Sequence, residues 1–314
     1  MTKLLQGDAL AVLRGMETAS FDACLTDPPY GLSFMGAAWD HGVPAAATWA
    51  EVLRVLKPGG HMLAFGGSRT HHRLMCAIED AGFEIRDCLM WLHGSGFPKA
   101  KSCLKPAWEP IILARKRGRV LPLNIDACRI GTDGGWKVAS ESGKRKSVST
   151  YGDGLNVGSA VPVPNLGRWP ANVLLDEEAA AALDAQSGIL TSGGYPESRN
   201  SDKFKNTFRV IKGGKVSPKL FGKSSGGASR FFYCAKASPP ERGAANNHPC
   251  VKPLKLIEHL AKLILPPNPE ARLLVPFSGS GSEILGARSA GWQHIIGIEQ
   301  SAEYVAIAEA RLAA

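Results

Sequence analysis

The sequence lacks paired cysteines and long apolar runs. Its seven cysteines are scattered with no CxxC pair, which disfavours a zinc ribbon or a thioredoxin-like redox site. No stretch is apolar for the length needed to cross a bilayer, and the start, MTKLLQGDALAVL, lacks the apolar core of a signal peptide. We therefore expect a reduced, cytoplasmic protein with no structural metal and no membrane contact.

Acidic residues are also relatively few. The chain has 28 Asp and Glu against 37 Lys and Arg, which gives a formal net charge of +9. This excess favours a polyanionic partner, with a merely solvated basic surface as the alternative. At 314 residues and 44% hydrophobic content, the chain can form one large α/β domain that carries an insertion.

Hydrophobic patterning divides the chain into three parts. Residues 1–120 alternate short apolar runs with amphipathic ones, such as FDACLTD and TWAEVLRVL, which predicts βαβ units and a parallel sheet. Residues 121–235 are rich in Gly, Ser, Lys and Asn, and we interpret them as an insertion or appended module. Within them, a short strand and then a helix are predicted from about Asp176 to Gly188. Residues 236–314 return to a helix, a strand, a glycine turn, a helix and a strand.

The stretch FDACLTDPPYGL carries a carboxylate to the end of a predicted strand. Pro28 and Pro29 then fix the backbone φ angles and remove amide donors, so their carbonyl groups stay outside any strand ladder. Asp27 and the Pro28 carbonyl thus form a rigid pair of acceptors, and the aromatic ring of Tyr30 follows. For an Asp-Pro-Pro sequence alone, a plain turn after a strand would be the ordinary alternative.

Near the carboxyl terminus, LLVPFSGSGSEILGA has the build of a nucleoside or dinucleotide site. A strand is followed by a turn in which Gly279 and Gly281 allow close backbone approach, and a helix begins near Ser282. Ile284 stands where a GxGxxG pattern has its third glycine, so a pyrophosphate cofactor fits less well than an adenosine with another tail. Glu299 follows at the spacing of an acid that binds ribose hydroxyls. Together these features suggest S-adenosylmethionine.

The acceptor motif precedes the cofactor motif in the chain. If the carboxy-terminal strands are the first and second of a doubly wound sheet, Lys3 to Gln6 begins the third strand. The strand that ends at Asp27 is then the fourth and lies beside the first, at the switch point where such sheets bind ligands. We therefore predict a circularly permuted, doubly wound, Rossmann-like α/β sheet. Asp8 would face the adenine edge of the cofactor, or would simply cap the following helix.

Four features together resemble the β-class DNA amino-methyltransferases. They are TDPPY at Thr26 to Tyr30, HPCVKP at His248 to Pro253, PFSGSG at Pro276 to Gly281 and the acid Glu299. These bacterial and phage enzymes methylate adenine N6 or cytosine N4. The resemblance covers residues 1–116 and about 230–314, and WEPIILARK is similar to the family's strand after the catalytic half. It implies S-adenosylmethionine as cofactor, double-stranded DNA as substrate, a homodimer, and a target recognition region within residues 121–235.

The resemblance also implies the site residues. Asp27 and the Pro28 carbonyl would accept the amino hydrogens of an extruded base and free its nitrogen lone pair for in-line attack on the sulfonium methyl, while Tyr30 stacks on the base. Pro29 completes the catalytic motif, whose Asp and Tyr favour adenine. The implied cofactor residues are Asp8, Ala9, Asp27, His248, Lys252, Pro253, Phe277, Ser278, Gly279, Ser280, Gly281, Ser282, Glu299 and Gln300. For His248 and Lys252, the start of a helix with solvated charges is the alternative interpretation.

Val275 stands where the family usually has Asp, and Cys250 where it usually has Thr, both near the cofactor. Val275 supports an alternative, a noncatalytic DNA-binding protein with an eroded cofactor pocket. A second alternative is methylation at cytosine C5, which needs a cysteine nucleophile such as Cys250. The DPPY motif has no role in that reaction, which argues against this alternative. Methylation of RNA or of a protein amide is a further alternative, and the basic insertion argues against a protein substrate.

Basic residues gather in segments that fit contacts with DNA phosphates, with solvated loops as the alternative. One segment runs from Lys99 to Arg119 and the other from Arg199 to Arg230. In the second, the basic residues are interleaved with Phe204, Phe208 and Phe221, which fits insertion of aromatic side chains between bases. The DNA-binding residues expected from these segments are Lys99, Lys101, Lys105, Arg199, Lys203, Lys205 and Arg209.

Overall fold

The structure, a computed structural model, describes residues 1–32, 40–94, 96, 98, 101, 103–131, 167–192, 224–235 and 251–313. Its strands are β1 (Thr2–Gln6), β2 (Phe21–Thr26), β3 (Leu56–Phe65), β4 (Glu84–Leu92), β5 (Trp108–Arg115), β6 (Val173–Asp176), β7 (Leu190–Ser192), β8 (Ser224–Gly226), β9 (Tyr233–Ala235), β10 (Arg272–Pro276) and β11 (His294–Glu299). Its α-helices are α1 (Ala9–Arg14), α2 (Ala46–Val55), α3 (His71–Asp80), α4 (Glu177–Ser187), α5 (Leu254–Leu263), α6 (Ser282–Ala290) and α7 (Ala302–Ala313). Short 3-10 helices are η3 (Asp126–Cys128) and η6 (Ala228–Phe231).

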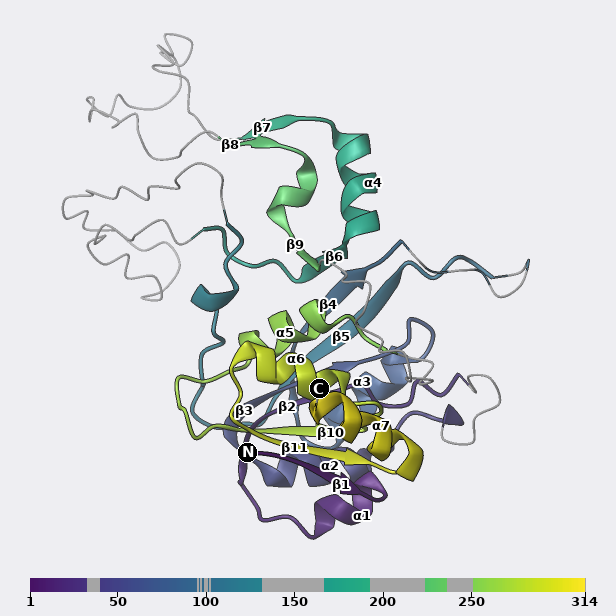
Figure 1. The fold of residues 1–314 in the computed structure, drawn as a ribbon, viewed down its shortest axis with the longest axis vertical. Helices are drawn as coiled ribbons and strands as arrows, with labels where there is room; N and C mark the ends of the chain where they lie inside the picture. The colour runs from purple at the N-terminus through teal and green to yellow at the C-terminus, as the bar shows by residue number, and fades with distance from the viewer. Residues whose placement is uncertain are drawn as a thin grey trace, which may run out of the picture.

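The main sheet has nine strands in the order β1-β11-β10-β2-β3-β5-β4-β6-β9 (Figure 1). The first five strands in this order run parallel to one another, whereas β5 is antiparallel to both of its neighbours, β3 and β4. The carboxy-terminal strands β10 and β11 therefore lie between β1 and β2, which come from the start of the chain. The predicted circularly permuted, doubly wound sheet is confirmed.

Helices cover both faces of this sheet, with α1, α2 and α3 on one face and α5, α6 and α7 on the other (Figure 1). Each face of the sheet has its own hydrophobic core, and neighbouring residues of a strand point alternately into one core and the other. Leu25 and Leu63 pack with α5 and α6, while Cys24 and Met62 pack with α1, α2 and α3. Every residue of β2 is buried. A central parallel strand is buried on both faces, which explains why FDACLT is a continuous apolar run around one acid rather than an alternating one.

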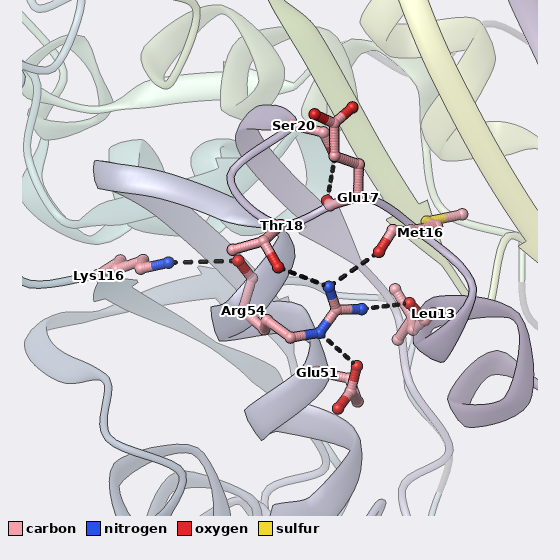
Figure 2. Close-up of polar contacts among 8 residues, drawn as sticks. All are labelled: Leu13, Met16, Glu17, Thr18, Ser20, Glu51, Arg54 and Lys116. Carbon is pink, nitrogen blue, oxygen red and sulfur yellow. Dashed lines mark hydrogen bonds and ion pairs between the residues drawn. The ribbon is translucent and has the colours of Figure 1, made fainter.

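The connection from α1 to β2 is held by Arg54 of α2 (Figure 2). Its guanidinium donates to the carbonyls of Leu13 and Met16 at 2.7 and 2.8 Å. It also donates to Thr18 Oγ1 at 2.9 Å and pairs with Glu51 at 2.8 Å. The Leu13 carbonyl, near the end of α1, thereby gains a donor in addition to the Met16 amide. The bonds of Arg54 also fix the approach of the chain to β2, the strand that ends at the DPPY motif.

Part of residues 121–235 joins the main sheet, because β6 pairs in parallel with β4 and β9 with β6. The strand and helix predicted around Asp176 are confirmed as β6 and α4. The Asp176 side chain accepts from the Ala179 amide at 2.7 Å, and the helix ends before Gly188, whose φ is 60°. A separate pair, β7 and β8, lies with α4 beyond the end of the sheet (Figure 1). The role of this region in target recognition stays a prediction.

Candidate active site

The carboxyl ends of β2 and β10 are tied together by one hydrogen bond. The hydroxyl of Thr26, the last residue of β2, donates to the carbonyl of Pro276, the last of β10, at 2.6 Å. Both residues are buried. DPPY follows Thr26 and the glycine loop follows Pro276, so motifs far apart in the sequence lie side by side at the switch point of the sheet.

Asp27, Tyr30, Glu109 and Lys252 form a connected group that we name the Asp27 cluster. The Tyr30 hydroxyl donates to Asp27 Oδ1 at 2.7 Å, and Lys252 Nζ donates to Asp27 Oδ2 at 2.8 Å. Lys252 Nζ also lies 3.0 Å from the Tyr30 hydroxyl oxygen and 3.2 Å from Glu109 Oε2. The Tyr30 hydroxyl is 3.1 Å from the same Glu109 oxygen. The cluster thus joins the end of β2, the start of β5 and the segment before α5.

The Asp27 cluster is largely withdrawn from solvent, with the Lys252 side chain 7% and the Asp27 side chain 13% exposed. Burial alone lowers the pKa of Lys252, but the attraction of Asp27, Glu109 and Tyr30 outweighs it and holds that pKa well above its usual value. Burial and the nearby charge of Asp27 raise the pKa of Tyr30 well above its usual value. At neutral pH, Lys252 is therefore an ammonium and Tyr30 a neutral phenol. The alternative that Lys252 is a solvated charge is wrong.

A cavity of about 640 Å³ lies beside the cluster, within the usual range for a small-molecule site. Pro253 and Gly281 do not line it and instead precede α5 and α6. Gly281 has φ 83°, and a Cβ there would lie 3.1 Å from the Cβ of Ala308, so this position requires glycine. His248 lies outside the described residues. The expected site residues that line the cavity are Asp8, Ala9, Asp27, Pro28, Pro29, Tyr30, Lys252, Phe277, Ser278, Gly279, Ser280, Ser282, Glu299 and Gln300.

The glycine loop is fixed by the acid at the end of β11. Glu299 Oε2 accepts from the Gly279 amide and Oε1 from the Ser301 amide, each at 2.8 Å. Each carboxylate oxygen has a further lone pair, so the carboxylate can still accept the hydroxyl groups of a ribose. Phe277 has φ 58°, a left-handed conformation that is strained for a residue with a side chain. The backbone of this loop is thus held in one shape at the cavity wall.

Asp8 caps a helix and also lines the cavity, while its contact with adenine stays a prediction. Its side chain accepts from the Ala11 amide at 2.9 Å and caps α1. It also lines the cavity, on the same side as Ala9 and Leu10. Capping uses Oδ1, which leaves Oδ2 able to accept a hydrogen bond from a ligand.

Three residues in or beside the site, Glu109, Glu283 and Arg311, were not predicted from the sequence. Glu109 belongs to a strand that gave no sign of facing DPPY. Glu283 lines the cavity from the first turn of α6, where an acid is ordinarily explained by the helix dipole. Arg311 of α7 donates to the carbonyl of Ser280 at 2.6 Å and lies 3.0 and 3.1 Å from the hydroxyls of Ser280 and Ser282.

The expected DNA contacts are described only in part. Lys101 and Lys105 are exposed, whereas Lys99, Arg199, Lys203, Lys205 and Arg209 lie outside the described residues. Over the described ranges, no group of three or more His, Cys, Asp and Glu side chains is arranged to hold a metal ion. Nor is any described helix both long and apolar enough to span a membrane.

The sequence profile of the N6 and N4 methyltransferases, described as DNA methylase, matches residues 21–310. The type II methyltransferase M.HpaI of Haemophilus parainfluenzae is 26% identical over 136 residues, which are 41% of this chain and 43% of that protein. The type II methyltransferase M.HindIII of Haemophilus influenzae is 23% identical over 272 residues, which are 84% of this chain and 67% of that protein. The matched part thus covers less than half of the first of these relatives.

The fold is shared with a solved structure, the cytosine-N4-specific PvuII DNA methyltransferase. This chain aligns with it at 16% identity and a TM-score of 0.54, over 99% of this chain and 86% of that one. The M1.HpyAVI complex with S-adenosylmethionine aligns over 99% of this chain and 100% of that chain, at 17% identity and a TM-score of 0.48.

S-adenosylmethionine is the cofactor of the family whose profile matches this chain, and the cavity fits it. Gly279 and the strained backbone at Phe277 give the close approach that a nucleoside needs, and Glu299 and Asp8 offer acceptors for ribose and adenine. The lining of the cavity includes several acidic side chains, among them Asp27, which suits a positively charged sulfur. With a profile match from residue 21 to residue 310, the chain belongs to the DNA methylases of the N6 and N4 methyltransferase family.

Proposed function

We propose that this chain is a site-specific DNA methyltransferase that transfers a methyl group to adenine N6 in double-stranded DNA. The observation that carries the proposal is the position of Asp27, whose carboxylate lines the cofactor cavity while Tyr30 and Lys252 hold its two oxygens. When bound, S-adenosylmethionine supplies an electrophilic methyl group on a positively charged sulfur.

In this proposal, Asp27 and the Pro28 carbonyl hold the target amino group. An exocyclic amino nitrogen is a poor nucleophile because its lone pair is delocalised into the ring. Acceptors for both amino hydrogens favour a pyramidal nitrogen and aim its lone pair at the methyl group. Tyr30 and Lys252 each use one lone pair of an Asp27 oxygen, so each oxygen keeps another for the amino group. The nitrogen gains a methyl group and loses a proton, which Asp27 is placed to accept.

The proposal assigns Lys252 and Glu109 to positioning Asp27. The ammonium of Lys252 lies within 3.2 Å of both Asp27 and Glu109 and therefore balances two carboxylates that would otherwise repel each other. Its Nζ is also 5.2 Å from the ring centroid of Tyr30. Because the Tyr30 hydroxyl is bonded within the cluster, the ring has a fixed orientation against which an extruded base can stack.

The choice of adenine rests on the tyrosine form of the motif, and the matched relatives include the DNA adenine methyltransferase YhdJ of Escherichia coli, 29% identical over 133 residues. Cytosine N4 is the second candidate, because its amino group needs the same acceptor geometry. The noncatalytic alternative rested on Val275, which packs in the hydrophobic core and does not line the cavity.

The test is to incubate the protein with unmethylated plasmid and S-adenosylmethionine, digest the DNA and identify methylated nucleosides by mass spectrometry. Asp27→Ala is the variant, and Asp80→Asn, an exposed carboxylate in α3, is the matched control. We expect N6-methyladenine from the wild type and the control but not from Asp27→Ala. N4-methylcytosine would instead support the second candidate, and a lack of product despite cofactor and DNA binding would support a noncatalytic protein.

Binding of DNA by Lys101, Lys105 and the basic segments of residues 121–235 is also part of the proposal. If these residues contact phosphates, DNA affinity falls steeply as salt rises, and each charge removed lowers the slope. The homodimer expected from the resemblance is a prediction that sedimentation equilibrium tests directly.

A further inference from the structure

Glu283 is a buried carboxylate that lines the cofactor cavity. It lies in the first turn of α6 and is only 4% exposed, yet its side chain belongs to the cavity wall. Glutamate is almost never this deeply buried unless it is paired, because removing a carboxylate from water is costly. The carboxylate therefore needs a function or a partner.

No described residue supplies that partner. Three charged groups face Glu283: Asp27 at the end of β2, Lys252 before α5, and Arg311 of α7. Among the described side chains, none donates a hydrogen bond to Glu283 or forms an ion pair with it, and its own backbone amide is the hydrogen-bond donor. Lys252 is bonded to Asp27 and Tyr30, and Arg311 to the serines of the glycine loop. The Glu283 carboxyl group thus lines the cavity without a bonded side-chain partner among the described residues.

The cavity as a whole is acidic. Its wall has Lys252 as the single described cation, and Lys252 is already bonded to Asp27. A cavity with this charge attracts a cation rather than a phosphate. The described acids of the wall are Asp8, Asp27, Asp40, Glu283 and Glu299.

The two ends of the cavity differ in what they can bind. Asp8 and Glu299 stand at the ends of β1 and β11, where the adenosine is expected, and backbone amides hold them. Glu283 is instead close enough to Asp27 for their charges to interact. If the methyl group lies beside the amino nitrogen that Asp27 would hold, the sulfur lies at the same end of the cavity as Glu283.

We propose that the Glu283 carboxylate binds the sulfonium end of S-adenosylmethionine and thereby favours it over the uncharged thioether product, S-adenosylhomocysteine. This inference rests on the proposed methyl transfer at Asp27, but it concerns the cofactor alone. The apolar side chain of Val275 is in the core, so this position before the glycine loop offers no carboxylate, whereas Glu283 of α6 lines the cavity. Selective loss of affinity after transfer would help the product to leave.

The titration of Glu283 gives this proposal a second signature. Burial and then the charge of Asp27 raise its pKa to about 8, against the opposing effects of Lys252 and Arg311. In the free protein at pH 7, Glu283 is therefore mostly protonated, and a cation beside it favours the ionised form. Binding of S-adenosylmethionine then releases a proton, and affinity rises as pH increases toward 8 and beyond. Binding of the uncharged thioether releases no such proton.

The test is isothermal titration calorimetry of both ligands without DNA, in buffers that differ in ionisation enthalpy. For the wild type at pH 7 we expect release of most of one proton with S-adenosylmethionine and close to none with S-adenosylhomocysteine. We expect Glu283→Gln to weaken S-adenosylmethionine by roughly 10- to 100-fold, to leave S-adenosylhomocysteine unchanged, and to abolish proton release. Glu299→Gln is the matched control and should weaken both ligands equally, because they share the adenosine.

Equal loss of both ligands in Glu283→Gln, or unchanged affinity for both, would overturn the proposal. Thermal unfolding of each variant shows whether it is folded. If Glu283→Gln does not fold, the wild-type protein alone decides, since binding of S-adenosylmethionine without proton release contradicts the proposal. Because no DNA is present, the outcome is independent of which base is methylated.

Discussion

Lys252 Nζ lies 2.8 Å from Asp27 Oδ2, although the two residues are 225 positions apart in the chain. The contact exists because the permuted sheet brings the segment before α5 against the carboxyl end of β2. It brings Lys252 of HPCVKP together with Asp27 and Tyr30 of DPPY in one polar cluster. The lysine expected to bind cofactor therefore also contacts the carboxylate expected to hold the target amino group.

Lys252→Met tests this contact. Removing the ammonium leaves two neighbouring carboxylates without compensation, so we expect the free energy of unfolding to fall by about 3 kcal/mol. Methylation at pH 7 should also fall, because Asp27 loses the group that holds its Oδ2 in place. The control is Lys255→Met, an exposed lysine of α5, which should change stability by less than about 0.5 kcal/mol. A rate of methylation by Lys252→Met equal to that of the wild type would argue against the positioning role.

Glu109→Gln tests whether Glu109 acts through Lys252. We expect a fall of roughly 10-fold in kcat, with an unchanged KM for the cofactor, because Glu109 contacts Lys252 and Tyr30 and does not line the cavity. In a Lys252→Met background, the same substitution should cause little further loss. Steady-state kinetics of both single variants and the double variant measure this coupling. Independent, additive losses would show that Glu109 does not act through Lys252, and Glu79→Gln on the exposed face of α3 is the control.

His259 makes stability depend on pH. It is buried in α5, its ring stacks on Tyr233 with centroids 3.8 Å apart, and burial followed by Lys262 lowers its pKa to about 4. The folded state therefore binds this proton less readily than the unfolded state. Stability is present above pH 6.5 and is lost as pH falls toward 4, by about 3 kcal/mol for this residue.

Denaturant unfolding between pH 4 and 7 measures this loss. His259→Asn should be less stable at pH 7 and should show a flatter dependence on pH than the wild type. His72→Asn, an exposed histidine of α3, should keep the wild-type slope. His61, whose pKa is also lowered to about 4, by burial and by Arg115 and Arg86, accounts for a slope that persists in His259→Asn. A wild-type curve that is flat across this range would contradict the assignment.

Arg54→Met tests the support of β2. The Met16 carbonyl loses the Arg54 donor, the Leu13 carbonyl loses one of its donors, and the ion pair with Glu51 is lost. We expect the free energy of unfolding to fall by about 2 kcal/mol. Arg86→Met, at the more exposed ion pair with Glu84, should change it by less than about 0.5 kcal/mol. Chemical denaturation gives both values. A loss in Arg54→Met no larger than that in Arg86→Met would show that Arg54 does not hold the connection to β2.

Much of the fold could be predicted because the relevant signals are local. Apolar runs such as those of β2 and β10 are typical of central parallel strands, and the positions of DPPY and the glycine loop were enough to predict the permuted order. The joining of β6 and β9 to the sheet could not be predicted, because strands of four and three residues carry little signal about distant partners.

The candidate site was harder to predict where a role depends on a distant partner. The sequence could not decide between a solvated and a buried Lys252, because its burial depends on Asp27 and Glu109. Glu283 gave no signal, since an acid in a first helical turn usually stabilises the helix dipole. Its burial and its place in the cavity wall appear only once β10, α6 and α7 are assembled.

The most direct test of the central claim is the rate of methyl transfer by Asp27→Ala, measured under single-turnover conditions beside separate titrations of S-adenosylmethionine and DNA. We expect the rate to fall by about 100- to 1,000-fold, because the acceptor that frees the amino lone pair is gone, while both affinities change only by a few fold. A rate close to that of the wild type, with DNA and cofactor bound normally, would contradict the role of Asp27 and with it the proposed mechanism.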